Sequence, residues 1–160
     1  MIKLDLIFVG TLKERWLTDA VAEYEKRLGA WCQINNILIR DERLPDKPSQ
    51  TEIQNAVRRE GERILSAIPP RARVFALCVE GNQMSSPAFS EKLASLERNG
   101  FSEFCFIIGG SDGLSDDVKR RADERMSFSE MTFPHQLMRV ILLEQLYRAF
   151  SIASGGKYHK

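Results

Sequence analysis

The last residues of the chain, SIASGGKYHK, concentrate side chains that can do chemistry. The imidazole of His159 can accept a proton, the cation of Lys160 can stabilise negative charge, and Tyr158 adds an aromatic ring. Chain ends are usually frayed, so a disordered end that happens to carry these residues is the alternative. If the tail is functional, Gly155-Gly156 would be the hinge that folds it back.

The stretch IIGGSDGLSDD has the glycines of a phosphate-binding loop without the pattern of one. It contains neither G-x-x-x-x-G-K-[ST] nor G-x-G-x-x-G, and the helix behind it opens with Asp116 and Asp117. Carboxylates at a helix N-terminus occupy the position that a phosphate would take. The turn therefore favours a neutral or cationic ligand that approaches the bare backbone of Gly109 and Gly110. A tight turn that needs glycine for its conformation is the alternative.

The stretch FSEMTFPHQLMR combines a strand end, a loop and a helix that Pro134 opens. Backbone groups in such a loop can wrap a ligand, and Met131 and Phe133 could flank an adenine ring. His135 lies in the first helical turn, where a surface or capping histidine is the alternative to a catalytic one. For the loop as a whole, the alternative is an ordinary strand-to-helix connection.

These segments are positioned by a regular alternation of strands and helices. Apolar runs between turn residues predict strands at 3–10, 34–39, 73–79, 104–110 and 125–133, and helical spacing predicts helices at 17–29, 49–68, 86–99, 115–122 and 135–151. Ser49 with Glu52 matches a capping box, Ser115 is expected to cap its helix, and Pro87 is expected at the first helical position after Ser86. This order predicts an α/β fold with a mostly parallel sheet and helices on both faces. Ligands bind beyond the carboxyl ends of such strands, which here are Glu80-Gly81, Gly109-Gly110 and Ser129 to Phe133.

The last helix is apolar on nearly all sides, which indicates that it is buried all round. An outer helix of a 160-residue domain should keep one wet face, so the excess suggests an apolar partner, most simply a second copy of the chain. Arg139, Glu144 and Arg148 interrupt the pattern. Glu144 and Arg148 stand four residues apart, so an ion pair within the helix is the simplest explanation for both.

Composition limits the function classes further. The length suggests one domain, and the net charge of +1 is too balanced for a strong stand-alone nucleic-acid binder. Cys32, Cys78 and Cys105 are odd in number and far apart, which is typical of reduced thiols in a cytoplasmic protein. With two histidines and no long apolar run, the sequence predicts neither a metal site nor a membrane segment.

The motifs IIGGSDGLS and MSFSEMTFPHQLMRVILLEQLYRA, with the terminal YHK, resemble the ribosomal RNA large-subunit methyltransferase H family, a minimal branch of the SPOUT methyltransferases. The resemblance covers residues 1–160 and implies a single homodimeric domain whose part from about 74 to 160 forms a deep trefoil knot. It also implies that the chain binds S-adenosylmethionine and methylates N3 of a pseudouridine in a 23S rRNA stem-loop on the assembled ribosome.

Carried over position by position, the resemblance divides the candidate residues into a cofactor group and a target group. The cofactor group is Leu77, Gly109, Gly110, Phe128, Ser129, Glu130, Met131, Thr132 and Phe133, and the target group is His135, Arg148, Tyr158 and His159. His159 is the first candidate for a general base and His135 the second. Two alternatives stay open: a non-catalytic ribosome-associated module with a vestigial cofactor pocket, and a small-molecule enzyme that uses another nucleotide.

Overall fold

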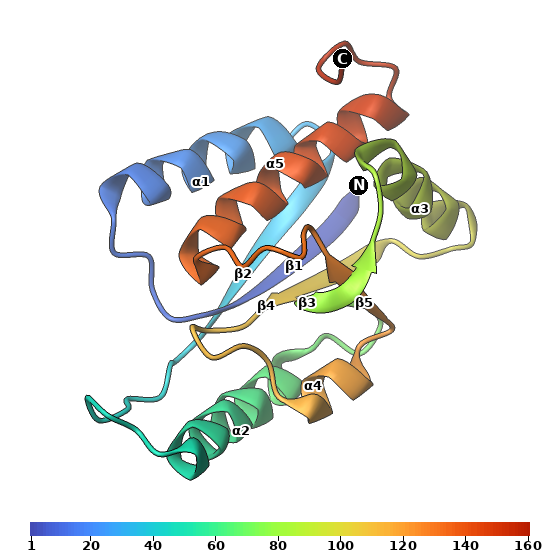
Figure 1. Ribbon diagram of the computed structural model, residues 1–160. Coiled ribbons are helices and arrows are strands. Elements are labelled where there is room, and N and C mark those ends of the chain that lie inside the picture. The colour runs from blue at the N-terminus through green and yellow to red at the C-terminus, as the bar shows by residue number, and fades with distance from the viewer.

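The computed structural model describes residues 1–160, whose strands form one sheet (Figure 1). All neighbouring strands are parallel, in the order β2-β1-β4-β3-β5. The elements in chain order are β1 Ile2–Val9, α1 Arg15–Leu28, β2 Cys32–Ile39, α2 Gln50–Ala67, β3 Arg73–Gln83, α3 Ser86–Arg98, β4 Glu103–Ile108, α4 Asp116–Arg121, β5 Glu124–Ser127 and α5 His135–Ala153. The prediction of an α/β fold with a parallel sheet is confirmed.

Helices cover both faces of the sheet, as predicted. Figure 1 shows α1, α3 and α5 on one face, with α5 between the other two, and α2 and α4 on the opposite face. The larger apolar cluster lies under the first group, where the rings of Phe75 and Phe106 stack with centroids 4.7 Å apart. The smaller cluster includes Ile64 of α2 and Val118 of α4. Burial on both faces explains why the strands read as continuous apolar runs.

Three of the helices have a serine at the N-cap position, with its side chain bonded to the first turn. Ser49 and Glu52 form the predicted capping box at the start of α2, with both hydrogen bonds at 3.1 Å. Ser115 caps α4, also as predicted. Ser85 caps α3, so the helix starts one residue earlier than expected and Pro87 is its second residue rather than its first.

The strand predicted over 125–133 is wrong in its second half, because β5 ends at Ser127. The hydroxyl of Ser127 donates to the carbonyl of Ser129 at 2.9 Å, and the hydroxyl of Ser129 accepts from the Met131 N–H at 3.0 Å. These local bonds compete with the strand ladder. The neighbouring β3 is longer than predicted and runs on to Gln83, with a register shift in its pairing with β5. The chain therefore leaves the sheet as a loop that leads into α5.

Helix α5 is buried toward the sheet and half-buried on its outer side. Leu142, Leu143 and Leu146 are fully buried, whereas Val140 and Ile141 remain partly exposed. No element of this chain covers the outer side, so its burial by a second copy stays a prediction. Neither α5 nor any other helix has the length and apolar content needed to cross a bilayer.

The Gly-Gly pair after α5 forms a tight turn. Gly155 has φ of +76°, a conformation that glycine adopts without strain. The N–H of Gly156 donates to the carbonyl of Ser151 at 2.8 Å, and a Cβ at position 156 would lie 2.5 Å from Ser151 Oγ. The turn reverses the chain, so the last residues pack back against the C-terminal end of α5 (Figure 1).

Candidate active site

A cavity of about 680 Å³ lies at the carboxyl ends of β3, β4 and β5. Three segments far apart in the sequence line it, at 77–80, 108–114 and 126–135. They bring together most of the residues that the sequence singled out: Leu77, Gly109, Gly110, Phe128, Ser129, Met131, Thr132, Phe133 and His135. Glu130 lies in the same loop but is exposed and does not line the cavity. Lining residues that the prediction omitted include Cys78, Val79 and Met138.

The double-glycine turn is both tight and open to the cavity. A Cβ at Gly109 would lie 2.7 Å from backbone atoms of Gly113, whose N–H donates to the carbonyl of Gly110 at 3.1 Å. A Cβ at Gly110 would instead meet side chains, at 3.3 Å from Val9 Cγ1. The two interpretations of these glycines are therefore compatible, since the same turn is sterically restricted and lines the cavity.

An ionised carboxylate stands at the rim of the cavity. Glu80 follows the buried part of β3, and its carboxylate accepts a hydrogen bond from Lys119 of α4. This hydrogen bond lowers the pKa of Glu80 below its ordinary value. The strand-end rule indicated Glu80-Gly81 as a place to look, and the structure brings Glu80 to the cavity with Leu77.

His135 stands where this cavity meets a second one of about 640 Å³, which Asp41 and Glu60 line on the other side. Burial lowers the pKa of His135, and the positive charges of Arg139 and Lys13 lower it further, against the opposing effect of Asp41. The imidazole is therefore neutral at neutral pH, with one nitrogen free to accept a proton.

Arg139 holds the first turns of α5 against the end of β1. Its guanidinium donates to the carbonyls of Val9, at 3.0 Å, and Gly10, and it lies 4.7 Å from the centre of the Phe8 ring. Burial lowers its pKa to about 10. The sequence showed Arg139 only as an interruption of an apolar helix. Its role depends on a contact with residues 130 positions away, for which the sequence carries no local signal.

The remaining three target residues form a separate cluster at the other end of α5. Glu144 Oε1 accepts from Arg148 Nε at 3.0 Å and from the Tyr158 hydroxyl at 3.2 Å, and Arg148 Nη1 lies 3.1 Å from His159 Nδ1. The Tyr158 ring packs edge-on against Tyr147 with centroids 4.7 Å apart. Burial is the main cause that raises the pKa of Tyr158 to about 12. The ion pair expected between Glu144 and Arg148 is present, and the tail is docked upon it.

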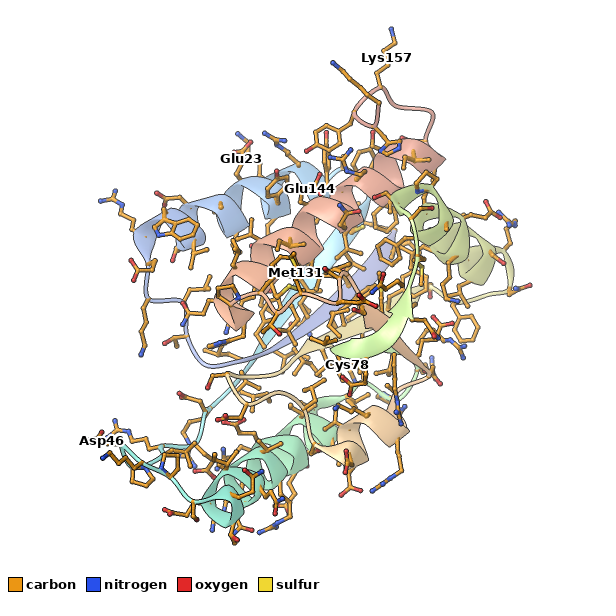
Figure 2. The ribbon with its side chains drawn as sticks, in the orientation of Figure 1. Glu23, Asp46, Cys78, Met131, Glu144 and Lys157 are labelled. Atoms are coloured by element: carbon orange, nitrogen blue, oxygen red, sulfur yellow. The ribbon has the colours of Figure 1, made fainter.

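This tail cluster does not reach the cavity of its own chain. Figure 2 shows Lys157 beyond the C-terminal end of α5 and Glu144 about halfway along this helix, with Met131 and Cys78 nearer the strands. Arg148 follows His135 by thirteen positions on one helix, a separation of about 20 Å along its axis. The predicted target group is thus divided between the cavity, with His135, and the tail cluster, with Arg148, Tyr158 and His159.

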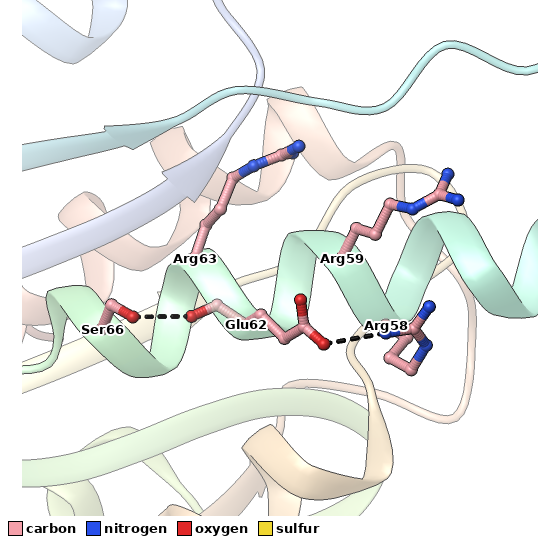
Figure 3. A pocket seen from close by; sticks show the side chains of 5 residues that line it. All are labelled: Arg58, Arg59, Glu62, Arg63 and Ser66. Atoms are coloured by element: carbon pink, nitrogen blue, oxygen red, sulfur yellow. Dashed lines mark hydrogen bonds and ion pairs between the residues drawn. The ribbon is translucent and has the colours of Figure 1, made fainter.

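A hollow along α2 is lined by arginines but gathers none of the candidate residues (Figure 3). Arg58 pairs with Glu62 at 2.8 Å, and Arg63 pairs with Glu42 at 2.7 Å, so most of its charge is compensated. Nowhere in the structure do three or more His, Cys, Asp or Glu side chains form a group that could hold a metal ion.

Comparison with known proteins gives a consistent relationship over the whole length. A family model described as "Predicted SPOUT methyltransferase" matches residues 2–159. A Streptococcus suis protein named "Ribosomal RNA large subunit methyltransferase H" is 48% identical over 158 residues, which is 99% of this chain and 99% of that protein. A protein of the same name from Bacillus pumilus is 49% identical over 157 residues, or 98% of this chain and 99% of that protein.

Solved structures support the fold at much lower sequence identity. A "probable methylase family protein" from Haemophilus influenzae Rd KW20 superposes with a TM-score of 0.55 at 10% identity, over 98% of this chain and 70% of that one. A protein studied for the 2-OH methylation of C/U34 on tRNA superposes with a TM-score of 0.52 at 20% identity, over 96% of this chain and 98% of that one. At these identities the likeness concerns the fold alone.

Proposed function

Because the chain belongs to the SPOUT methyltransferase family, we propose that it methylates the RNA of the large ribosomal subunit with S-adenosylmethionine as the methyl donor. The proposed acceptor is N3 of a pseudouridine in a 23S rRNA stem-loop, reached on the assembled ribosome. The observation that carries the proposal is the cavity at the ends of β3, β4 and β5, where three separate segments of the chain and a neutral histidine meet.

The lining of the cavity fits S-adenosylmethionine in size and in chemistry. Its volume of about 680 Å³ lies within the range of small-molecule sites. Leu77, Phe128 and Phe133 provide apolar walls for an adenine ring, and the backbone at Gly109 lies open at the end of β4. The carboxylates of Glu80 and Asp112 outnumber the cation of Lys119 in the lining, which suits a ligand that carries positive charge and no phosphate.

The residues of the chain have two tasks in the proposed reaction. When bound, S-adenosylmethionine supplies an electrophilic methyl group on a sulfonium centre. The first task is to hold N3 of the base in line with that methyl, and positioning of this kind supplies roughly 7–11 kcal/mol. The second task is to remove the proton from N3, and neutral His135 at the cavity is our candidate for the base. The proton then passes from His135 to solvent. This reverses the order in which the sequence ranked the two histidines.

We propose that the enzyme acts as a homodimer in which a second copy supplies the tail. An arginine side chain cannot bridge the length of helix that separates Arg148 from the cavity of its own chain. The partly exposed apolar side chains of Val140 and Ile141 on the outer side of α5 provide a surface for pairing. Two-fold symmetry would bring the same surface of both copies together and carry each tail toward the other copy.

Family membership also supports three further expectations. The chain forms one domain over 1–160, its residues from about 74 onward are threaded as a trefoil knot, and it acts in the cytoplasm. Partial proteolysis of the native protein should release no stable fragment, since β1 is paired with β4 in the middle of a single sheet.

The test is to incubate the protein with labelled S-adenosylmethionine and either intact ribosomes, separated subunits or naked rRNA. We expect label in 23S rRNA from intact ribosomes, in a digestion product with the mass and mobility of N3-methylpseudouridine. Calorimetry on the protein alone should detect the cofactor. Binding of ribosomes without binding of the cofactor would instead indicate a non-catalytic module with a vestigial pocket.

A truncated variant tests the tail cluster separately from the cavity. Removal of residues 158–160 should abolish methylation and leave cofactor affinity nearly unchanged, because no residue of the tail lines the cavity. Lys157→Ala is the matched control, since Lys157 is exposed and makes no hydrogen bond to the cluster. Full turnover by the truncated protein would remove the tail from the mechanism.

A further inference from the structure

The contact between Arg148 and His159 determines which nitrogen of the imidazole carries the proton. Arg148 Nη1 lies 3.1 Å from His159 Nδ1. A guanidinium has five N–H donors and no acceptor, so in this hydrogen bond Nδ1 must be the acceptor. The proton of the neutral ring is then on Nε2, and Nε2 can only donate.

Arg148 is held in place by Glu144. The carboxylate oxygen Oε1 of Glu144 accepts from both Nε, at 3.0 Å, and Nη2, at 2.5 Å, which directs Nη1 toward His159. The guanidinium also lies 4.7 Å from the centre of the Tyr158 ring. The side chains of Glu144 and Arg148 are only 18% and 23% exposed, so water competes weakly for these bonds.

Glu144 is itself fixed from three directions. Its Oε1 accepts from the Tyr158 hydroxyl at 3.2 Å, and its Oε2 accepts from Gln145 Nε2 at 2.9 Å. Gln145 in turn accepts from the hydroxyl of Ser86, at the start of α3, at 2.6 Å. A continuous chain of hydrogen bonds therefore runs from α3 through Glu144 and Arg148 to the imidazole. His159 meets this network through Nδ1, and its Nε2 makes no hydrogen bond within the chain.

We propose that Glu144, acting through Arg148, positions His159 as a hydrogen-bond donor, so that its Nε2–H binds a carbonyl oxygen of the target base while His135 removes the proton. The assignment rests on the proposed function and makes Glu144 a positioning residue. As N3 loses its proton, negative charge spreads onto the neighbouring carbonyl oxygens, and a fixed N–H donor stabilises that charge. An imidazole with Nδ1 engaged and Nε2 already protonated has no free site to accept the proton.

Nitrogen NMR of the imidazoles tests the tautomer without any methylation. In the unmodified protein we expect the Nδ1 of His159 to resonate as an unprotonated nitrogen and its Nε2 as a protonated one, with the signals assigned by their loss in His159→Gln. Glu144→Ala should release Arg148 and shift both signals toward the average of a tautomer mixture. Glu91→Ala is the matched control, because it removes an exposed glutamate–arginine pair on α3, with Arg98.

A His159 that carries its proton on Nδ1, or a spectrum that Glu144→Ala leaves unchanged, would overturn the proposal. If Glu144→Ala fails to fold, Glu144→Gln replaces it, since the amide keeps the shape and removes the charge. The NMR outcome stands whether or not the protein methylates rRNA, so failure of the proposed function is recognised separately, by the absence of methylation in the unmodified protein.

The donor role predicts a specific pattern of activity among variants. The amide N–H of glutamine reaches about as far as the Nε2–H of histidine, so His159→Gln should keep kcat within about tenfold, whereas His159→Ala should lower it about 100- to 1,000-fold. Cofactor affinity should not change in either variant. Equal loss in the two variants would show that a donor at this position is not sufficient and would refute the role assigned to His159.

Discussion

Gly61 of α2 and Ser115 at the start of α4 approach so closely that a Cβ at position 61 would lie 2.3 Å from Ser115 Oγ. Ser115 Oγ also accepts the Val118 N–H at 3.3 Å, so it cannot move away without loss of the helix cap. Alanine is the better helix former by about 1 kcal/mol, yet Gly61→Ala should lower the free energy of unfolding by roughly 1–3 kcal/mol because of overpacking. Urea denaturation measures the difference.

The matched experiment repeats this substitution in the Ser115→Ala background. Ser115→Ala alone should cost about 1 kcal/mol for the lost cap. Gly61→Ala should then cost less than it does in the unmodified protein, because the closest atom is gone. A stabilising Gly61→Ala in the unmodified protein would show that the two helices can separate freely.

Gly109 and Gly110 should respond differently to alanine. A Cβ at Gly109 meets backbone at 2.7 Å, so Gly109→Ala should distort the turn, destabilise the fold by roughly 1–3 kcal/mol and abolish cofactor binding. At Gly110 the nearest atoms belong to the side chains of Val9 and Glu60, at 3.3 and 3.5 Å, so alanine should be tolerated. Calorimetry and urea denaturation of both variants check the order, and the reverse order would contradict it.

The methylation rate should fall at acidic pH because His135 becomes protonated, which gives the pH–rate profile an acidic limb. A base must be deprotonated, so the rate should rise with pH and level off, with a midpoint below the ordinary histidine pKa of about 6.5. His135→Gln should remove this limb and lower the plateau about 100- to 10,000-fold. His159→Gln serves as the control and should keep the limb. A limb that survives in His135→Gln would assign the base elsewhere.

Asp5, buried in β1, should make stability depend on pH. Burial raises its pKa, against the opposing hydrogen bond that Asn35 donates at 2.8 Å. The folded state thus binds this proton more tightly, so the free energy of unfolding falls as pH rises from about 3.9 through the raised pKa. Asp5→Asn should flatten that decline and be the more stable protein at neutral pH. Urea denaturation from pH 4 to 8, with exposed Asp19→Asn as control, measures it, and parallel curves for Asp5→Asn and the unmodified protein would contradict the prediction.

The sequence predicted the sheet and the cavity well because both follow from local rules. Strands in a βα alternation must run parallel, so their carboxyl ends meet at one edge, and the segments after β3, β4 and β5 converge there. The end of β5 was predicted wrongly because the side chains of Ser127 and Ser129 form local hydrogen bonds with the backbone. A pattern of apolar residues carries no signal for such bonds. The capping box at Ser49 was readable because its two partners lie three residues apart.

The separation of His135 from the other target residues was harder to predict, although it follows from the length of the last helix. Thirteen helical positions separate His135 from Arg148, but a list of functional residue types carries no distances. The roles of Arg139 and Glu144 depend on partners in β1 and in the tail, which only the folded chain brings near. In the sequence both residues only interrupt an apolar helix. In the structure Arg139 holds the start of α5, which carries His135, and Glu144 holds Arg148, which contacts His159.

The burial of the thiols has a practical consequence. Cys32 and Cys105 are enclosed in the core, and burial raises the pKa of each to about 12. Burial raises the pKa of Cys78 as well, but this thiol is only partly buried and forms part of the cavity wall. In the native protein an alkylating reagent should therefore react with Cys78 alone. The rate of this reaction, measured without ribosomes, would report the fraction of the protein whose cavity is occupied by a ligand.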